Sequence, residues 1–265
     1  MRTRCARAVT ALALTALAAG AAPALAEGPA SGLSVTPGKV DITVSAAGPY
    51  NVPLMVRNSA ATPTHIVVSQ QDFRLDEDGN YTYVPAGSIA TSDARWLAVN
   101  PREFDLAPGA FQEVQLTLNV PRQSLAGEYS GVLLVQSRPG RRGGGLTFSA
   151  RIATKVYATI DGTSHPDATV TGMSAAAGEQ GMHYHIAFRD TGNTHLYIKG
   201  RLEIRRAGAL VQALPLPAAM LVERGGERSI DVNGARLPPA SYEAVAILDY
   251  GGATRTGGRI RFDAR

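Results

Sequence analysis

The chain has 265 residues with a single cysteine, and its 26 lysine and arginine residues face 22 aspartate and glutamate residues. Three of the arginines lie in the first seven residues, so 23 basic residues face 22 acidic ones once residues 1–26 are set aside. The remaining net charge is +1, and the only basic cluster is formed by Arg138, Arg141 and Arg142. Because nucleic-acid binding needs a basic face or stripe, this composition excludes a nucleic-acid partner.

Residues 1–26 predict a secretory signal peptide. They combine the positive segment MRTRCAR, the apolar run AVTALALTALAAGAA and an A-x-A cleavage site at residues 24–26. The run is too short and too rich in alanine for a membrane span, and no second apolar span follows, so we expect no stable membrane insertion. Cys5 lies in the leader, and a mature chain that begins at Glu27 outside the cytoplasm would contain no thiol, disulfide or thiolate metal site.

The mature chain predicts an all-β sandwich. Short apolar or alternating runs recur between Gly, Pro, Asn and Asp residues: LSVTPGKVDITV, VPLMVRN, HIVVSQQDF, YTYVPAG, FQEVQLTLNVP and YSGVLLVQ. In LDEDGNYTY we expect a hairpin turn at Asp78-Gly79 rather than a calcium loop, because the glycine comes at the fourth position and the twelfth is not glutamate. Trp96 is expected in the core beside a strand that ends at a proline.

The second half of the chain repeats the plan of the first. Residues 106–135 and 222–248 each contain a glycine turn, an alternating strand, a proline-bearing loop and a tyrosine that opens another apolar strand. In immunoglobulin-like sandwiches such a tyrosine, here Tyr129 or Tyr242, forms a corner in which its hydroxyl binds the backbone. We therefore predict two immunoglobulin-like domains, residues 27–162 and residues 163–265, joined near DGTSHPD.

Three histidines occur in MHYHIAFRDTGNTHLYIKG. His183 and His185 share one face of a predicted strand; if the chain folds back near Asp190, residue 185 faces residue 198, and His195 points to the other side. We expect solvent-facing histidines rather than a metal site. The serines lie in turns, and no nucleophile–base set is recognisable, so we predict a protein that is not an enzyme and has no cofactor.

The segment from residue 146 to residue 160 alternates over an unusual length. One face carries Leu146, Phe148, Ala150 and Ile152, and the other carries polar residues that include Lys155. A long apolar strand near a sheet edge allows two interpretations: its side chains fill the domain's own core, or the strand is offered to a partner that lacks one. Periodicity alone favours the first.

LTFSARIATKVY and LSVTPGKV resemble the last and first strands of the N-terminal domain in the periplasmic pilus-assembly chaperones, the PapD-like family. The resemblance implies two immunoglobulin-like domains set in an L, exported to the periplasm without a membrane anchor. It also implies that the last strand of the first domain donates alternating apolar side chains to an incomplete pilin-like subunit. Two basic residues in the cleft between the domains would hold the subunit's C-terminal carboxylate.

Matched residue by residue, the resemblance implies a donor strand that contains Leu146, Phe148 and Ala150, with Ile152 next on the same face. Lys155 matches the cleft lysine, and Lys39 stands where the family usually has arginine. Pilin-like subunits are the expected partners, with an outer-membrane usher as a second one. The family usually continues with aromatic residues and an Arg-Pro pair where this chain has VYATI, so we expect its interdomain salt bridge to be missing or rebuilt.

A second resemblance keeps an alternative open. WLAVNPREFDLAPGAFQEVQLTLNVPRQSLAGEYSGVLLV and ARIATKVYATIDG are also similar to the WxL-interacting surface proteins of Gram-positive bacteria. Those proteins pair a peptidoglycan-binding sandwich with a partner-binding one, and they normally end in a membrane helix and a basic tail. This sequence ends in GGRIRFDAR instead, which favours the chaperone. An extracytoplasmic adaptor or a cell-wall or glycan-binding module is the alternative.

Overall fold

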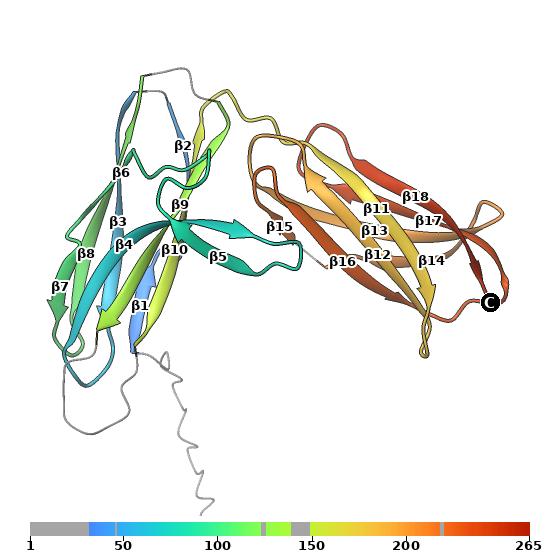
Figure 1. The fold of residues 1–265 in the computed structure, drawn as a ribbon, viewed down its shortest axis with the longest axis horizontal. Helices are drawn as coiled ribbons and strands as arrows, with labels where there is room; N and C mark the ends of the chain where they lie inside the picture. Colours follow the sequence, from blue (N-terminus) through green and yellow to red (C-terminus); the bar gives the residue numbers. More distant parts are fainter. Residues whose placement is uncertain (1–31, 46, 123–125, 139–148, 218–219) are drawn as a thin grey trace, which may run out of the picture.

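The computed structural model describes residues 32–45, 47–122, 126–138, 149–217 and 220–265. In these ranges the chain forms eighteen β-strands and no helix, which confirms the predicted all-β class. The strands build two sandwiches that meet at an angle (Figure 1). The predicted signal peptide, Leu146 and Phe148 lie outside the described residues. Among the residues described, no helix has the length and apolar character of a membrane span.

The first sandwich packs a four-stranded sheet on a six-stranded one. In spatial order the smaller sheet contains β1 (Leu33–Thr36), β3 (Gly48–Asn58), β8 (Phe111–Val120) and β6 (Leu97–Asn100). The larger contains β2 (Lys39–Val44), β10 (Arg151–Ile160), β9 (Glu128–Arg138), β4 (Thr64–Leu75) and β5 (Tyr81–Pro85), with β7 (Glu103–Leu106) paired to β4. Apolar residues from alternate positions, such as Leu54, Ile66 and Leu116, fill the space between the sheets.

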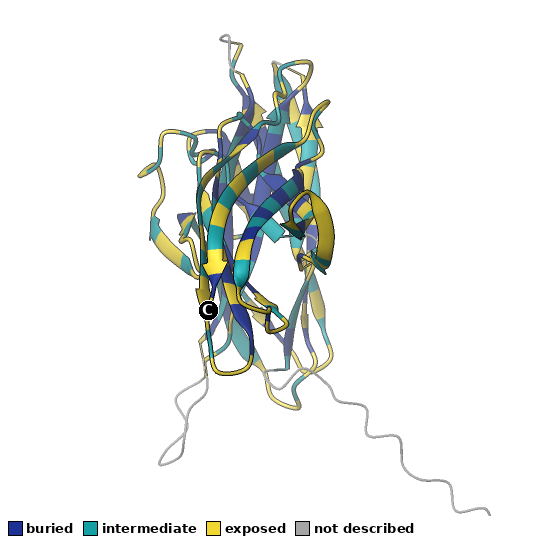
Figure 2. Ribbon diagram, turned by 90° about the vertical axis from the view of Figure 1, so that its right-hand side faces the viewer, coloured by how far each residue is buried: buried dark blue, intermediate teal, exposed yellow. Residues whose placement is uncertain are grey.

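The second sandwich has its own pair of sheets and its own core. One sheet contains β11 (Ala168–Ala177), β12 (Met182–Asp190) and β16 (Glu227–Gly234). The other contains β14 (Ala209–Pro215), β13 (Leu196–Arg206), β17 (Ala240–Asp249) and β18 (Thr256–Ala264), with β15 (Met220–Val222) paired to β13. Buried and exposed residues alternate along the strands, as two packed sheets require (Figure 2). The proposed domain boundary between residues 162 and 163 falls between β10 and β11.

Several local predictions are confirmed. The Asp78-Gly79 turn joins β4 to β5 with Gly79 at a φ of 94°, and the Asn80 amide donates to Asp76 Oδ1 at 2.7 Å. Trp96 is buried in the first core. The Tyr242 hydroxyl donates to the carbonyl oxygen of Pro238 at 2.9 Å, which is the corner predicted for the second sandwich.

Tyr129 is the corresponding tyrosine of the first sandwich, and its ring contacts the side chain of Trp96. Its ring packs against the Trp96 ring, with 4.3 Å between the ring centroids. The sequence repeat therefore located both tyrosines at the start of a core strand. Tyr242 also has an aromatic neighbour, the Phe262 ring, with 5.8 Å between the ring centroids.

The expected fold-back of residue 185 onto residue 198 is wrong. β12 pairs with β11 and β16, whereas β13 pairs with β14, β15 and β17, so the chain crosses between sheets after Asp190. Alternation identifies the buried face of each strand but does not say which sheet a strand joins. His183 and His185 are exposed, as expected. The expectation of solvent exposure is wrong for His195, whose side chain is only 8% exposed.

Thr154 places a hydroxyl on the core face of β10. The residue is fully buried, and its Oγ1 has no hydrogen-bond partner within the described part of the chain. An unsatisfied buried hydroxyl costs about 1–3 kcal/mol, so the structure keeps an avoidable penalty at the centre of this strand.

We expect Thr154→Val to raise the free energy of unfolding by about 1 kcal/mol, because valine keeps the branched shape and removes the unpaired hydroxyl. Urea unfolding measures the change. Thr159→Val, in the same strand but on the opposite, less buried face, is the matched control and should change stability by less than about 0.5 kcal/mol. A loss of stability in Thr154→Val would show that the hydroxyl makes a bond the fold needs.

Candidate functional site

The two lysines singled out in the sequence lie next to each other. β10 runs parallel to β2, and Lys155 is the register partner of Lys39. Val40 and Val156, the residues that follow them, are buried in the first core. Since successive side chains point to opposite faces, both lysines project from the outer face of the sheet, and Lys39 reaches Tyr197 of the second sandwich.

Each lysine has a defined set of polar contacts. Lys39 Nζ donates to Asp41 Oδ2 at 2.7 Å and to the hydroxyl of Tyr197, on β13 of the second sandwich, at 3.1 Å. Burial lowers the pKa of Lys39, but the bonds to Asp41 and Tyr197 outweigh it, and the net shift is upward. Lys155 Nζ donates to the Tyr81 hydroxyl at 2.5 Å. Its pKa is lowered, first by burial and then by the nearby charge of Lys39.

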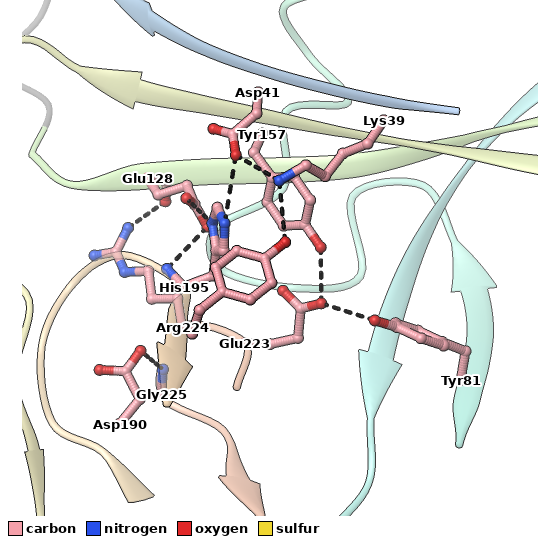
Figure 3. A network of polar contacts seen from close by, with 11 residues as sticks. Lys39, Asp41, Tyr81, Glu128, Tyr157, Asp190, His195, Glu223, Arg224 and Gly225 are labelled. Atoms are coloured by element: carbon pink, nitrogen blue, oxygen red, sulfur yellow. Dashed lines mark hydrogen bonds and ion pairs between the residues drawn. The ribbon is translucent and has the colours of Figure 1, made fainter. Parts of the chain in front are cut away.

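A carboxylate from the second sandwich completes this group. Glu223 follows β15, and its Oε1 accepts a hydrogen bond from the Tyr157 hydroxyl at 2.8 Å and one from the Tyr81 hydroxyl at 3.3 Å (Figure 3). Burial raises the pKa of Glu223, while the bond from Tyr157 and the charge of Lys155 oppose the rise. The Tyr81 hydroxyl therefore links the ammonium group of Lys155 to the carboxylate of Glu223.

An ionic contact beside the lysines joins the two sandwiches. His195, just before β13, places Nδ1 at 2.5 Å from Glu128 Oε2, and its backbone N–H donates to Oε1 of the same carboxylate at 3.2 Å. His195 Nε2 lies 3.5 Å from Asp41 Oδ2 on the other side. Arg224 Nη1 donates to the backbone carbonyl oxygen of Glu128 at 2.5 Å. The sequence predicted that the family's interdomain salt bridge would be missing or rebuilt. In the structure, a His195–Glu128 pair joins the two sandwiches.

The protonation state of His195 follows from its neighbours. Burial lowers its pKa, but the hydrogen bond and charge of Glu128, with further help from Asp41, outweigh burial and raise it overall. The imidazolium form is therefore stabilised at the junction, between two carboxylates of the first sandwich. Figure 3 shows the ring lying between Glu128 and Asp41.

The structure describes two of the four predicted donor residues. Ala150 and Ile152 are partly buried against the first core, as the core-filling interpretation expects. β9 pairs with β10 from Arg151 to Thr159, whereas β2 pairs with it only from Lys155 onward. In the described residues the first four positions of β10 therefore have an open edge on the side where β2 would continue.

Sequence reasoning missed the residues that the second sandwich contributes. Glu223, Arg224 and Tyr197 lie far from both lysines along the chain, and no spacing rule relates them to β2 or β10. Tyr157 could have been identified from the sequence, because an aromatic residue on the otherwise polar face of a strand suggests that another part of the protein covers this face. Among the residues that the structure describes, no three histidine, cysteine or acidic side chains converge in a group able to hold a metal ion.

We expect His195→Gln to reduce stability most at low pH. A histidine whose folded pKa is raised stabilises the native state fully below its unfolded pKa near 6.5, and this contribution is lost as the pH rises through the folded value. The variant should lose about 1.5–3 kcal/mol at pH 5.5, the range for hydrogen bonds to charged groups, and progressively less at higher pH. Denaturant unfolding at several pH values measures the difference.

The matched control is His183→Gln, an exposed histidine on β12. Its difference from the parent protein should stay small. A pH-independent difference for His195→Gln would show that the imidazole at the junction stays neutral.

Comparisons with known proteins show which solved structures share the fold of this chain. No family model matches the chain, and no curated protein matches it. The crystal structure of the class 5 fimbriae chaperone CfaA is similar, with 12% identity and a TM-score of 0.50 over 86% of this chain and 98% of that one. A chain from a chaperone–tip adhesin complex of CFA/I fimbriae biogenesis has 11% identity and the same TM-score of 0.50, over 86% of this chain and 97% of that one. The chain thus has the two-sandwich, immunoglobulin-like fold of the PapD-like fimbrial chaperones, which confirms the resemblance at the level of the fold.

Proposed function

We propose that this protein is a non-enzymatic periplasmic chaperone that binds pilin-like subunits during pilus assembly. Lys39 and Lys155 would hold the C-terminal carboxylate of the subunit. The main support for the proposal is that Lys39 and Lys155 are register partners on neighbouring strands. Both lie on the sheet face that borders the junction of the sandwiches. One of the structurally similar chains comes from a complex of a chaperone with a tip adhesin, which supports a subunit as the partner.

The electrostatics of the lysine pair favour an anionic ligand. Two ammonium groups on neighbouring strands repel each other, and Lys39 contributes to the lowered pKa of Lys155. A carboxylate between them would remove this repulsion and accept charge-assisted hydrogen bonds from both. Lysine offers point charges rather than the two-pronged geometry of arginine, so the site would fix the charge of the ligand more strictly than its orientation.

The open edge of β10 supports strand donation. The backbone groups of the first four residues of β10, starting at Arg151, are not covered by β2, and an extended segment of another chain could pair there. Ala150 and Ile152 are partly exposed, so some of their apolar surface is available to a partner. Leu146 and Phe148 would extend the same donor strand N-terminally. An outer-membrane usher is the second partner that we propose.

We expect Lys155→Ala and Lys39→Ala each to weaken binding of a pilin-like subunit by about 10- to 100-fold, because charge-assisted hydrogen bonds contribute about 1.5–3 kcal/mol. The pilin-like subunit encoded nearest to this chain's gene, co-expressed in the periplasm and purified as a one-to-one complex, provides the assay. Amidation of the subunit's C-terminus should reproduce the loss, and it should add little to either lysine variant.

Lys199→Ala is the matched control, since it removes the only other lysine of the chain, an exposed one on β13. It should leave binding unchanged. Binding to cell-wall material that ignores Lys155→Ala and needs no subunit would contradict the chaperone and favour the adaptor or wall-binding alternative.

We expect Phe148→Glu to abolish subunit capture and to leave the melting temperature unchanged, because a donated side chain is buried only in the complex. Ile152→Glu is the contrasting variant: Ile152 packs against the resident core, so a charge there should lower stability as well as binding. Thermal unfolding and complex formation are measured on both. Global unfolding of Phe148→Glu would place that side chain in the protein's own core.

A further inference from the structure

Each lysine of the proposed anchor is linked to a carboxylate in the free protein, Lys39 directly and Lys155 through a tyrosine hydroxyl. Lys39 is paired directly with Asp41, its neighbour on the same strand, at 2.7 Å. Lys155 has no carboxylate within 4.0 Å among the described residues; the acidic group that acts on it is Glu223, which raises its pKa through space. The Tyr81 hydroxyl accepts from Lys155 and donates to Glu223, so it carries the link between them.

In the part of the chain that the structure describes, the Glu223 carboxylate accepts hydrogen bonds only from hydroxyl groups. Two hydrogen bonds reach this carboxylate within the described residues; both come from tyrosine hydroxyls and both end at Oε1. The side chain also lines a cavity of about 270 Å³ between the sandwiches, together with Phe73, Ser130 and Arg224. The carboxylate therefore has neutral donors in its present position and open space beside it.

The backbone around Glu223 is fixed. Val222, the preceding residue, is fully buried and pairs with Leu196 of β13, and the following residue, Arg224, binds the carbonyl oxygen of Glu128. Only the side chain is free to exchange its partners, while the backbone stays anchored in the second sandwich. A carboxylate on such a side chain is a tethered ligand that is present at high effective concentration.

We propose that Glu223 is a resident carboxylate that occupies the anionic position beside Lys155 in the free protein and that an incoming carboxylate must displace. The role of a subunit as the incoming ligand rests on the proposed function, but the competition itself applies to any carboxylate. Glu223 then sets the selectivity of the site, since a ligand gains only the difference between its own contacts and those of the resident side chain.

The exchange would also change the contacts between the sandwiches. The two bonds to Glu223 come from β5 and β10 of the first sandwich, and Glu223 belongs to the second. Displacing the carboxylate breaks both of them and leaves the His195–Glu128 pair as a separate connection. Binding at the lysines is thereby coupled to how tightly the second sandwich is held.

The test uses acetate as the probe and the full mature protein at pH 7. Glu223→Gln keeps the shape and an acceptor for the tyrosine hydroxyls but removes the charge. We expect it to bind acetate at least fivefold more tightly than the parent protein, measured from the chemical shift of the Lys155 ammonium group. The same variant should show a lower pKa for Lys155, and therefore faster acylation of that amine at fixed pH.

Glu227→Gln, an exposed glutamate on β16 paired with Arg189, is the matched control and should leave acetate binding and Lys155 unchanged. Tyr157→Phe is a second variant that weakens the hold on Glu223 but keeps its charge, and its acetate affinity should lie between those of the parent and Glu223→Gln. Equal or weaker acetate binding by Glu223→Gln overturns the inference.

The test separates the two proposals. Tighter acetate binding by Glu223→Gln supports the resident carboxylate even if no pilin-like subunit forms a complex with the parent protein. Conversely, a subunit complex that depends on Lys155 while Glu223→Gln leaves acetate affinity unchanged would keep the proposed chaperone and remove the competitor.

Discussion

Parallel pairing of β2 with β10 is the constraint on which the candidate site depends. It aligns Lys39 with Lys155 and points both away from the first core, because the valine that follows each of them is buried. Two ammonium groups at a partly covered sheet face need negative partners, since burial and mutual repulsion both disfavour their charged forms. Asp41 on the same strand and Glu223 from the other sandwich supply that charge in the free protein.

The junction of the sandwiches therefore contains polar contacts, which lie beside a small buried apolar cluster of Phe73, Val132, Leu134 and Tyr157. The ring of Tyr157 is completely buried, yet its hydroxyl reaches Glu223, and the ring packs 4.4 Å from the imidazole of His195. A junction built from hydrogen bonds and an imidazolium–carboxylate pair fixes the angle between the sandwiches through directional contacts (Figure 3). Such contacts can be exchanged one at a time, which a continuous apolar interface does not permit.

β10, the last strand of the first sandwich, contributes to the core with one face and to the junction with the other. Its core face carries Val156 and Ala158, which are fully buried, while the opposite face presents Lys155 and Tyr157 to the junction. Its second half pairs with β2, whereas its first half has no strand on that edge among the residues that the structure describes. The same strand can thus hold its own domain together at one end and remain available for backbone pairing at the other, which is what the proposed chaperone requires.

The sequence by itself determined the strand content, the repeat of two sandwiches, the turn at Gly79 and the position of Lys155 on a polar strand face, whereas the partnership of Lys39 with Lys155 was implied only by the family resemblance. These follow from local rules: side chains alternate along a strand, and only a few residue types adopt the backbone of a tight turn. Tertiary structure alone decided that β12 and β13 join different sheets, that His195 is buried against Glu128, and that the Tyr81 hydroxyl links Glu223 to Lys155. Those contacts join residues up to 142 positions apart, and alternation carries no information about which distant strands meet.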